Sequence, residues 1–143
     1  MHLERKSFTA SGAPAQEGYE QVDFETLLTL SDIISVHAPL NEHTEGLINS
    51  KAFEKMKSSC IFLNLGRGPI VDEQALYNAL VRNQIAAAGL DVLCEEPMSA
   101  DNPLLKIKDS KHLLITPHIA WASVEARTHL MEIIHGQVKD FFA

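Results

Sequence analysis

The chain has 143 residues, enough for one domain with its own hydrophobic core and too few for two. It is 45% hydrophobic and 22% charged, as an ordinary globular domain is. Nineteen Asp and Glu against twelve Lys and Arg give a net charge of -7, which argues against a nucleic-acid partner and an anionic membrane surface.

Two further features indicate where the protein works. The apolar runs are of strand length, far below the about 20 residues that a membrane-spanning helix needs. Residues 1–6 contain no apolar signal-peptide core, and the two cysteines, Cys60 and Cys94, do not suggest a disulfide framework. We therefore expect a cytoplasmic protein with reduced thiols and no membrane partner.

The order of elements along the chain predicts a parallel sheet. Residues 9–14 are polar and contain glycine and proline, which indicates a loop. After residue 23, apolar runs recur about every 24 to 28 residues without the alternation of half-exposed strands. Such runs are typical of strands covered on both faces. The four runs are 33–36, 60–63, 85–90 and 113–115.

Helical patterns separate these runs. The first has one apolar face and Asp72 as a candidate N-cap; the face consists of Ala75, Leu76, Ala79 and Leu80. The second ends the chain, and its apolar residues at helical spacing are Leu130, Ile133, Ile134, Val138 and Phe141. Gly136 lies within it and should weaken it by about 1 kcal/mol relative to Ala. Strands and helices in this rhythm predict a doubly wound α/β fold with right-handed crossovers.

Each apolar run ends in a polar or glycine-bearing segment. These segments are 37–39, 64–68, Asp91 with 95–97, and 116–118. The carboxyl ends of parallel strands lie on one edge of the sheet, and ligands of open α/β sheets bind in the crevice outside that edge. We therefore expect the four segments to form one site.

The residue types in these segments suggest acid–base chemistry on an anion. Arg67, between two glycines, can bind a carboxylate through two parallel hydrogen bonds; the lesser alternative is a surface Arg in a turn. His118 follows a proline, which restricts the backbone and would hold the imidazole in place as a proton donor or acceptor. A carboxylate beside the ring would stabilise its protonated form, and both Glu95 and Glu96 are candidates.

A metal site and a phosphate loop are both disfavoured. The chain has no CxxC and no HExxH, and the six-residue spacing of His129 and His135 puts them on different faces of a helix, so we expect no metal. Residues 66–71 match the first half of GxGxxG, but Val71 occupies the last position. The dinucleotide fingerprint is therefore not in this sequence.

Four stretches, in this order and spacing, closely resemble the D-isomer-specific 2-hydroxyacid dehydrogenases. They are 31–40, 64–73, 89–97 and 116–120, and the resemblance covers essentially the whole chain. It implies a partial Rossmann-type doubly wound sheet. Residues 1–143 would then be the C-terminal part of an NAD-binding domain, without the glycine-rich first strand–helix unit and without the substrate domain.

The resemblance also implies a role for particular residues. Arg67 would bind the substrate carboxylate, His118 would exchange a proton with the reacting oxygen, and Glu96 would be its partner. Asp91 would contact the nicotinamide carboxamide. The cofactor would also be lined by His37, Ala38, Pro39, Leu65, Gly66, Arg67 and His118.

Residues near the start of the chain and after His118 bear on specificity. Glu4 would contact the adenosine ribose and favour NAD, although Arg5 and Lys6 leave NADP open and such a cluster can equally be solvated. Residues 116–123 resemble those of glycerate dehydrogenases, also called hydroxypyruvate reductases. Trp121 would then crowd the substrate pocket; alternatively, it is a packed aromatic that opens the final helix.

The predicted function is hydride transfer between NAD(H) and a small D-2-hydroxy acid or 2-keto acid, with hydroxypyruvate, glycerate or glyoxylate first. The alternative is an NADH-sensing, non-enzymatic corepressor-like protein with the same residues. The resemblance implies a homodimer when the chain is complete. We expect the fragment alone to be inactive and to self-associate, because the run 32–37 would be an exposed sheet edge.

Overall fold

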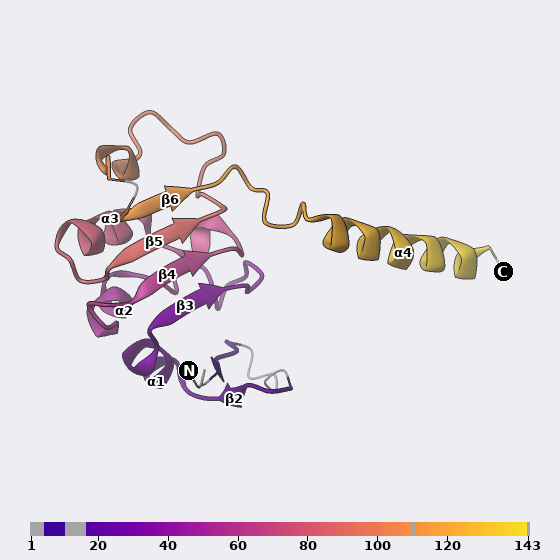
Figure 1. Cartoon of the computed structure of the whole chain (residues 1–143), viewed down its shortest axis with the longest axis horizontal. Coiled ribbons are helices and arrows are strands. Elements are labelled where there is room, and N and C mark those ends of the chain that lie inside the picture. Colours follow the sequence, from indigo (N-terminus) through magenta and orange to yellow (C-terminus); the bar gives the residue numbers. More distant parts are fainter. Residues whose placement is uncertain (1–4, 11–16, 110, 143) are drawn as a thin grey trace.

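The computed structural model describes residues 5–10, 17–109 and 111–142. Within these residues the main sheet has four parallel strands in the order β3, β4, β5 and β6 (Figure 1). The strands are β3 (Ile33–Val36), β4 (Ile61–Asn64), β5 (Ala87–Leu90) and β6 (Leu113–Ile115). Each falls within or against a predicted apolar run, so the predicted parallel α/β fold is confirmed.

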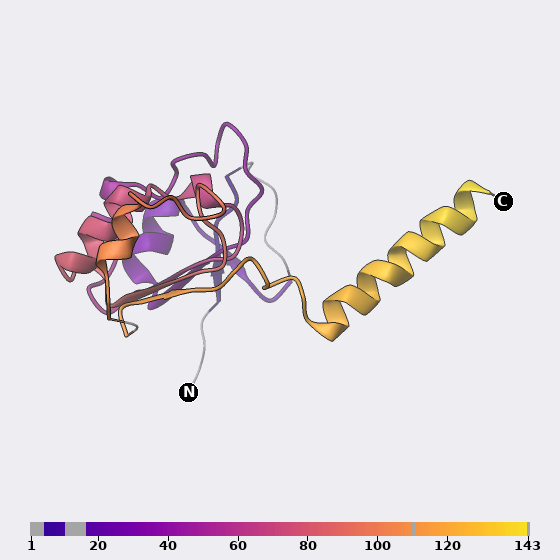
Figure 2. The same cartoon turned by 90° about the horizontal axis from the view of Figure 1, so that it is seen from above.

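Three short helices cover one face of this sheet: α1 (Phe24–Leu30), α2 (Ser50–Lys55) and α3 (Glu73–Val81) (Figure 2). Phe62 of β4 lies fully buried beneath them, and its ring meets Phe53 of α2 edge to face at 5.5 Å. The 3-10 turns η1 (Gly68–Ile70) and η2 (Pro103–Lys106) add Ile70 and Leu104 to this core. Of these three helices, only α3 was predicted from the sequence.

The prediction that both faces of the strands are covered is wrong for the described residues. Ile33 and Ile61, which are paired in the register of β3 and β4, are 60% and 40% exposed. Leu114 of β6 is 61% exposed. No described helix packs on this face of the sheet, so its apolar side chains remain in solvent (Figure 2).

The final helix, α4 (Val124–Phe141), projects away from the sheet (Figure 1). The helix itself was predicted, and Gly136 lies within it. Its apolar residues are nevertheless all exposed, from Ile134 at 40% to Phe141 at 83%. The helical spacing therefore identified the element but not its surroundings. Among the described residues, no helix is both long enough and apolar enough to cross a membrane.

A second, small sheet lies beside the first. It consists of β1 (Lys6–Ser7) and β2 (Glu20–Gln21), which are parallel and which the sequence analysis did not predict. No hydrogen bond of a sheet joins β1 or β2 to β3 in the described part of the chain. A cavity of about 920 Å³ separates the two sheets.

The predicted cap of α3 is confirmed. The Asp72 carboxylate accepts the Ala75 N–H at 2.9 Å, and Ala75 and Leu76 are buried on the face that packs against the sheet. Because α3 begins immediately after the loop that carries Arg67, this cap also fixes where that loop ends.

Asp72→Ala should lower the free energy of unfolding by about 1 kcal/mol, since an N-terminal N–H of α3 loses its acceptor. Chemical denaturation of the purified protein measures this. The control is Gln74→Ala on the exposed side of the same helix, which should change stability by less than about 0.5 kcal/mol. Equal effects of the two substitutions would contradict the capping role.

Candidate active site

The polar segments after β3 and β4 meet around a hollow of about 480 Å³ at the carboxyl edge of the sheet. It is lined by His37, Ala38, Pro39, Leu40, Leu65, Gly66 and Arg67. Six of these seven are the residues of the first two segments that the sequence analysis assigned to the cofactor. The arrangement follows from the parallel register, which brings Val36 opposite Asn64.

Asn64, the last residue of β4, shapes the loop that carries Arg67. Its buried side chain accepts the Gly66 N–H at 3.1 Å and donates to the Arg67 carbonyl at 3.0 Å. Gly66 packs so closely that a Cβ there would lie 2.8 Å from the Ala38 carbonyl oxygen. Arg67 itself is exposed, and its Nη1 donates to the Gly66 carbonyl at 2.9 Å.

Gly68 brings the Arg67 loop against the loop that carries Glu96. A Cβ at Gly68 would lie 1.9 Å from the Leu93 carbonyl oxygen and 2.4 Å from the Cys94 nitrogen. Its φ is not in the left-handed region, so contact alone requires glycine at this position. The two loops are therefore in backbone contact.

Glu73, at the start of α3, ties the Glu96 loop to this helix and was missed by the sequence analysis. Its Oε1 accepts the Cys94 N–H at 2.8 Å, and its Oε2 accepts from the buried Asn102 side chain at 2.7 Å. A lone Glu in the first turn of a helix is an ordinary feature that complements the helix dipole, so the sequence carried no distinct signal for this role.

Asp91 connects the end of β5 to the turn after β6. Its Oδ1 accepts the Thr116 hydroxyl at 2.6 Å and the Ile119 N–H at 2.9 Å, and its Oδ2 accepts the Ala120 N–H at 2.8 Å. Burial raises the pKa of Asp91, but these hydrogen bonds to the ionised form outweigh it and hold the pKa below its usual value.

The turn held by Asp91 places His118 in a strained backbone conformation. His118 has φ +55°, a left-handed conformation that costs a non-glycine residue roughly 1–3 kcal/mol. The Trp121 indole N–H donates to the His118 carbonyl at 2.8 Å from the opposite side of this turn. Trp121 is 59% exposed and precedes α4, so it is not packed into the described core.

The His118 ring faces Glu96 rather than Glu95. His118 Nδ1 lies 2.9 Å from Glu96 Oε2, while Glu96 Oε1 accepts the Leu93 N–H at 2.9 Å. With Nδ1 directed at the carboxylate, we place a proton there, and Nε2 has no hydrogen-bond partner among the described residues. The ring therefore offers Nε2 to a reacting group.

Both hydrogen bonds favour the ionised form of Glu96. The Leu93 N–H contributes most and His118 next, and together they hold the pKa of Glu96 below its usual value. A carboxyl whose pKa is lowered by folding stabilises the fold above its ordinary pKa, and this stabilisation is lost as pH falls through the lowered value. The pair is therefore intact at neutral pH.

The residues near the start of the chain are only partly described. Glu4, the predicted ribose contact, lies outside the described residues. The guanidinium of Arg5 lies 5.8 Å from the centre of the Tyr19 ring, and Lys6 Nζ lies 2.8 Å from Glu20 Oε2.

Both cysteines have a raised pKa, which favours the protonated thiol. Burial raises the pKa of Cys60 to about 11. Desolvation and the nearby Glu73 carboxylate raise the pKa of Cys94 to about 12. In the described ranges, no group of three or more His, Cys, Asp or Glu side chains is placed to hold a metal ion.

The carboxyl edge of the sheet carries the features of a ligand-binding site. The hollow beside Gly66 allows close backbone approach, and the adjoining segments carry a guanidinium at Arg67 and an imidazole at His118. Open α/β sheets bind ligands, dinucleotides among them, in the crevice at this carboxyl edge. Residues 4–120 match the family described as "D-isomer specific 2-hydroxyacid dehydrogenase, NAD binding domain", and the chain belongs to this family.

Individual relatives agree with this assignment. A hydroxypyruvate reductase of Blautia hydrogenotrophica is 45% identical over 125 residues, which cover 87% of this chain and 38% of the relative. An acyclic imino acid reductase solved with NADPH and D-Arg superposes with a TM-score of 0.84 and 34% identity, over 97% of this chain and 43% of the other.

A D-lactate dehydrogenase from Lactobacillus jensenii, solved with NAD+, superposes with a TM-score of 0.78 and 32% identity. The match covers 91% of this chain and 42% of that one. The chain thus spans less than half the length of each relative named here.

Gly68→Ala should separate the Arg67 loop from the Glu96 loop, because the added Cβ would overlap backbone atoms that cannot rotate away. We expect a loss of roughly 1–3 kcal/mol in stability, as for other overpacked sites. Thermal unfolding measures it. Gly136→Ala is the matched control: its Cβ meets nothing within 4 Å, and it should instead stabilise α4 by about 1 kcal/mol. If the Gly68→Ala protein were as stable as the unsubstituted protein, the close contact at Gly68 would be contradicted.

Proposed function

We propose that the protein containing this chain transfers a hydride between NAD(H) and a small D-2-hydroxy acid or its 2-keto acid. The observation that carries the proposal is the His118–Glu96 pair, 2.9 Å apart, on the sheet edge where the Arg67 loop begins after β4. Since the chain spans 38% of the length of the hydroxypyruvate reductase it resembles, the activity is proposed for a protein with the additional segments of such relatives.

The described residues suit the nicotinamide end of the cofactor, which supplies the hydride when bound. The segment 37–39 and the segment 65–67 would line it through their backbone. Asp91 is buried with three donors on its two oxygens, and one acceptor position of Oδ2 remains for a carboxamide N–H. We propose that the main role of Asp91 is to hold the turn that carries His118 through these hydrogen bonds. NAD is the cofactor proposed first, with NADP kept open because Glu4 is not described.

Arg67 would orient the substrate. Its Nη1 donates to the Gly66 carbonyl, and the N–H groups that remain can donate two parallel hydrogen bonds to a carboxylate. These two hydrogen bonds would bring the 2-keto group toward His118. The positive charge of Arg67 would also stabilise the keto oxygen as it gains electron density.

His118 would move the proton. During reduction, Nε2 would protonate the carbonyl oxygen; during oxidation, the same nitrogen would take the hydroxyl proton. Glu96 would hold the ring by Nδ1 and stabilise its protonated form. The left-handed backbone at His118, held by Asp91 and Trp121, would fix the direction of Nε2.

Hydroxypyruvate is the substrate proposed first, because a relative with 45% identity carries that name. Glycerate and glyoxylate share its small size. Trp121 is exposed beside His118 and would limit the substrate pocket. A cytoplasmic homodimer, with the chain alone inactive, completes the proposal. NADH oxidation with hydroxypyruvate tests it: no turnover in the complete protein would favour the NADH-sensing, non-enzymatic alternative.

Arg67→Lys in the complete protein should lower kcat/KM for hydroxypyruvate by at least about 10-fold, since an ammonium cannot reproduce a planar two-bond grip. Steady-state NADH oxidation measures this. Arg82→Lys, at the exposed end of α3, is the control and should leave turnover unchanged. Near-normal kinetics of Arg67→Lys would contradict the carboxylate role.

Glu96→Gln should move the alkaline limb of the pH profile for reduction to lower pH. The protonated imidazole would lose the carboxylate that stabilises it, so the proton donor would be depleted earlier as pH rises. The readout is kcat/KM between about pH 5 and 9, and Glu95→Gln is the control. An unchanged midpoint in Glu96→Gln, or an equal shift in both variants, would exclude the assigned pairing.

A further inference from the structure

The peptide group between Leu93 and Cys94 is held from two sides. Its carbonyl packs against Gly68, where a Cβ would lie 1.9 Å from the carbonyl oxygen. Its N–H donates to Glu73 Oε1 at 2.8 Å. The Leu93 N–H, one residue earlier, donates to Glu96 Oε1 at 2.9 Å. The position of the Glu96 carboxylate therefore follows from the position of this one peptide group.

The Glu73 carboxylate is itself held from the protein core. Its second oxygen, Oε2, accepts from the Asn102 side-chain amide at 2.7 Å. Asn102 is buried, and its Oδ1 accepts the Leu104 N–H at 2.9 Å. Leu104 is part of the hydrophobic core. A chain of hydrogen bonds thus runs from the core through Asn102 and Glu73 to the loop that carries Glu96.

This chain of hydrogen bonds requires a carboxylate at Glu73. Two donors face the side chain, the Cys94 N–H and the Asn102 amide, and a carboxylate accepts from both. The Asn102 amide cannot turn round, because its NH2 group would then meet the Leu104 N–H. Desolvation first, then the Glu73 and Asp72 carboxylates, raise the pKa of the Cys94 thiol to about 12, so this thiol adds no charge beside Glu73.

We propose that Glu73 and Asn102 are positioning residues for proton transfer: they fix the loop at residues 93–96 so that Glu96 stays against Nδ1 of His118. The inference rests on the proton transfer proposed for His118. Neither side chain has a hydrogen bond to His118 in the described part of the chain, so both act through the loop. The Leu93 N–H lowers the pKa of Glu96 most and His118 next, and a displaced loop would weaken both hydrogen bonds.

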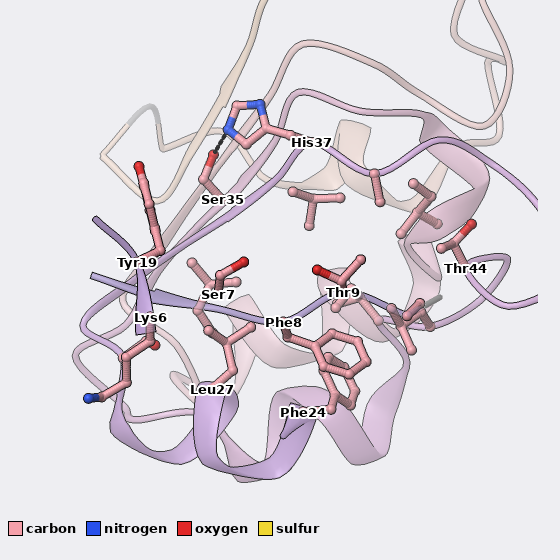
Figure 3. Close-up of a pocket in the computed structure, with 18 of the residues that line it drawn as sticks. Lys6, Ser7, Phe8, Thr9, Tyr19, Phe24, Leu27, Ser35, His37 and Thr44 are labelled. Carbon is pink, nitrogen blue, oxygen red and sulfur yellow. Dashed lines mark hydrogen bonds between the residues drawn. The ribbon is translucent and has the colours of Figure 1, made fainter. Parts of the chain in front are cut away.

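The other titratable groups at this edge of the sheet do not replace this control. The Leu93 N–H has the largest influence on the pKa of Glu96, and the charge of Asp91, which raises it, has the smallest. His37 Nε2 lies 2.8 Å from Ser35 Oγ, on the wall of the cavity between the two sheets (Figure 3). His37 therefore belongs to a separate pair.

Exchanging the two side chains tests the proposal in the complete protein. Glu73→Gln sets an NH2 group against one of the two donors, and Asn102→Asp sets two carboxylates against each other. Each should lower kcat/KM for hydroxypyruvate by about 10-fold and move the alkaline limb of the pH profile to lower pH. Glu73→Gln combined with Asn102→Asp re-forms every hydrogen bond with donor and acceptor exchanged, and should restore kcat/KM to within about 3-fold and return the limb.

Asn49→Ala is the control for a loss of stability alone. It removes the N-cap of α2, far along the chain from the Glu96 loop, and should lower stability without moving the alkaline limb. A Glu73→Gln protein with an unchanged pH profile, or a double variant as impaired as the single ones, would overturn the proposal. If Glu73→Gln alone does not fold, the double variant gives the same decision.

NMR titration of the His118 ring, in the complete protein with isotope-labelled histidine, separates this proposal from the proposed function. If the unsubstituted protein does not oxidise NADH with hydroxypyruvate, the proposed function fails, but the ring still reports the position of Glu96. Its titration midpoint should fall in each single variant and return in the double variant. A midpoint that is the same in the unsubstituted protein and in all these variants would overturn the positioning role.

Discussion

The Asp91 carboxylate is the interaction on which the geometry of the site depends. Asp91 directly follows β5, and its carboxylate accepts three hydrogen bonds from residues 116, 119 and 120 after β6. A charged acceptor buried with three donors is stable only while all of them remain, because an unpaired buried charge is costly. This mutual dependence fixes the turn in which His118 adopts its left-handed backbone. The direction of the imidazole is therefore a property of the strand ends rather than of a flexible loop.

A second constraint joins this unit to Arg67. Gly68 removes the side chain that would keep the Arg67 loop from the Glu96 loop, and Glu73 ties the latter to the start of α3. Because the Arg67 and Glu96 loops share backbone contact, movement of one would disturb the other. The groups that we propose to bind the substrate carboxylate and to transfer the proton thus lie on contacting loops at one edge of the sheet, and the proposed hydride transfer would need such fixed positions.

The sequence predicted what depends on local pattern. The four apolar runs became strands, Asp72 became a cap, and the segments at residues 37–39 and 65–67 meet around one hollow. What it did not predict depends on contacts between residues that are distant in the chain. These are the hydrogen bonds of the Glu73 carboxylate and the close approach of backbone at Gly68. Residue type alone also did not choose between Glu95 and Glu96 as the partner of His118. Nor does an apolar run or a helical period reveal whether a partner covers it, so the bare face at Ile33 and the exposure of α4 emerged only from the structure.

A structure of the complete protein with NADH and the substrate analogue oxamate would test the central claim most directly. We expect the Arg67 guanidinium to make two hydrogen bonds to the analogue's carboxylate, and His118 Nε2 to lie within about 3.2 Å of its carbonyl oxygen. The Glu96 and Asp91 contacts should be unchanged. An analogue carboxylate bound away from Arg67, or a His118 ring turned away from the carbonyl with Nε2 in solvent, would contradict the account.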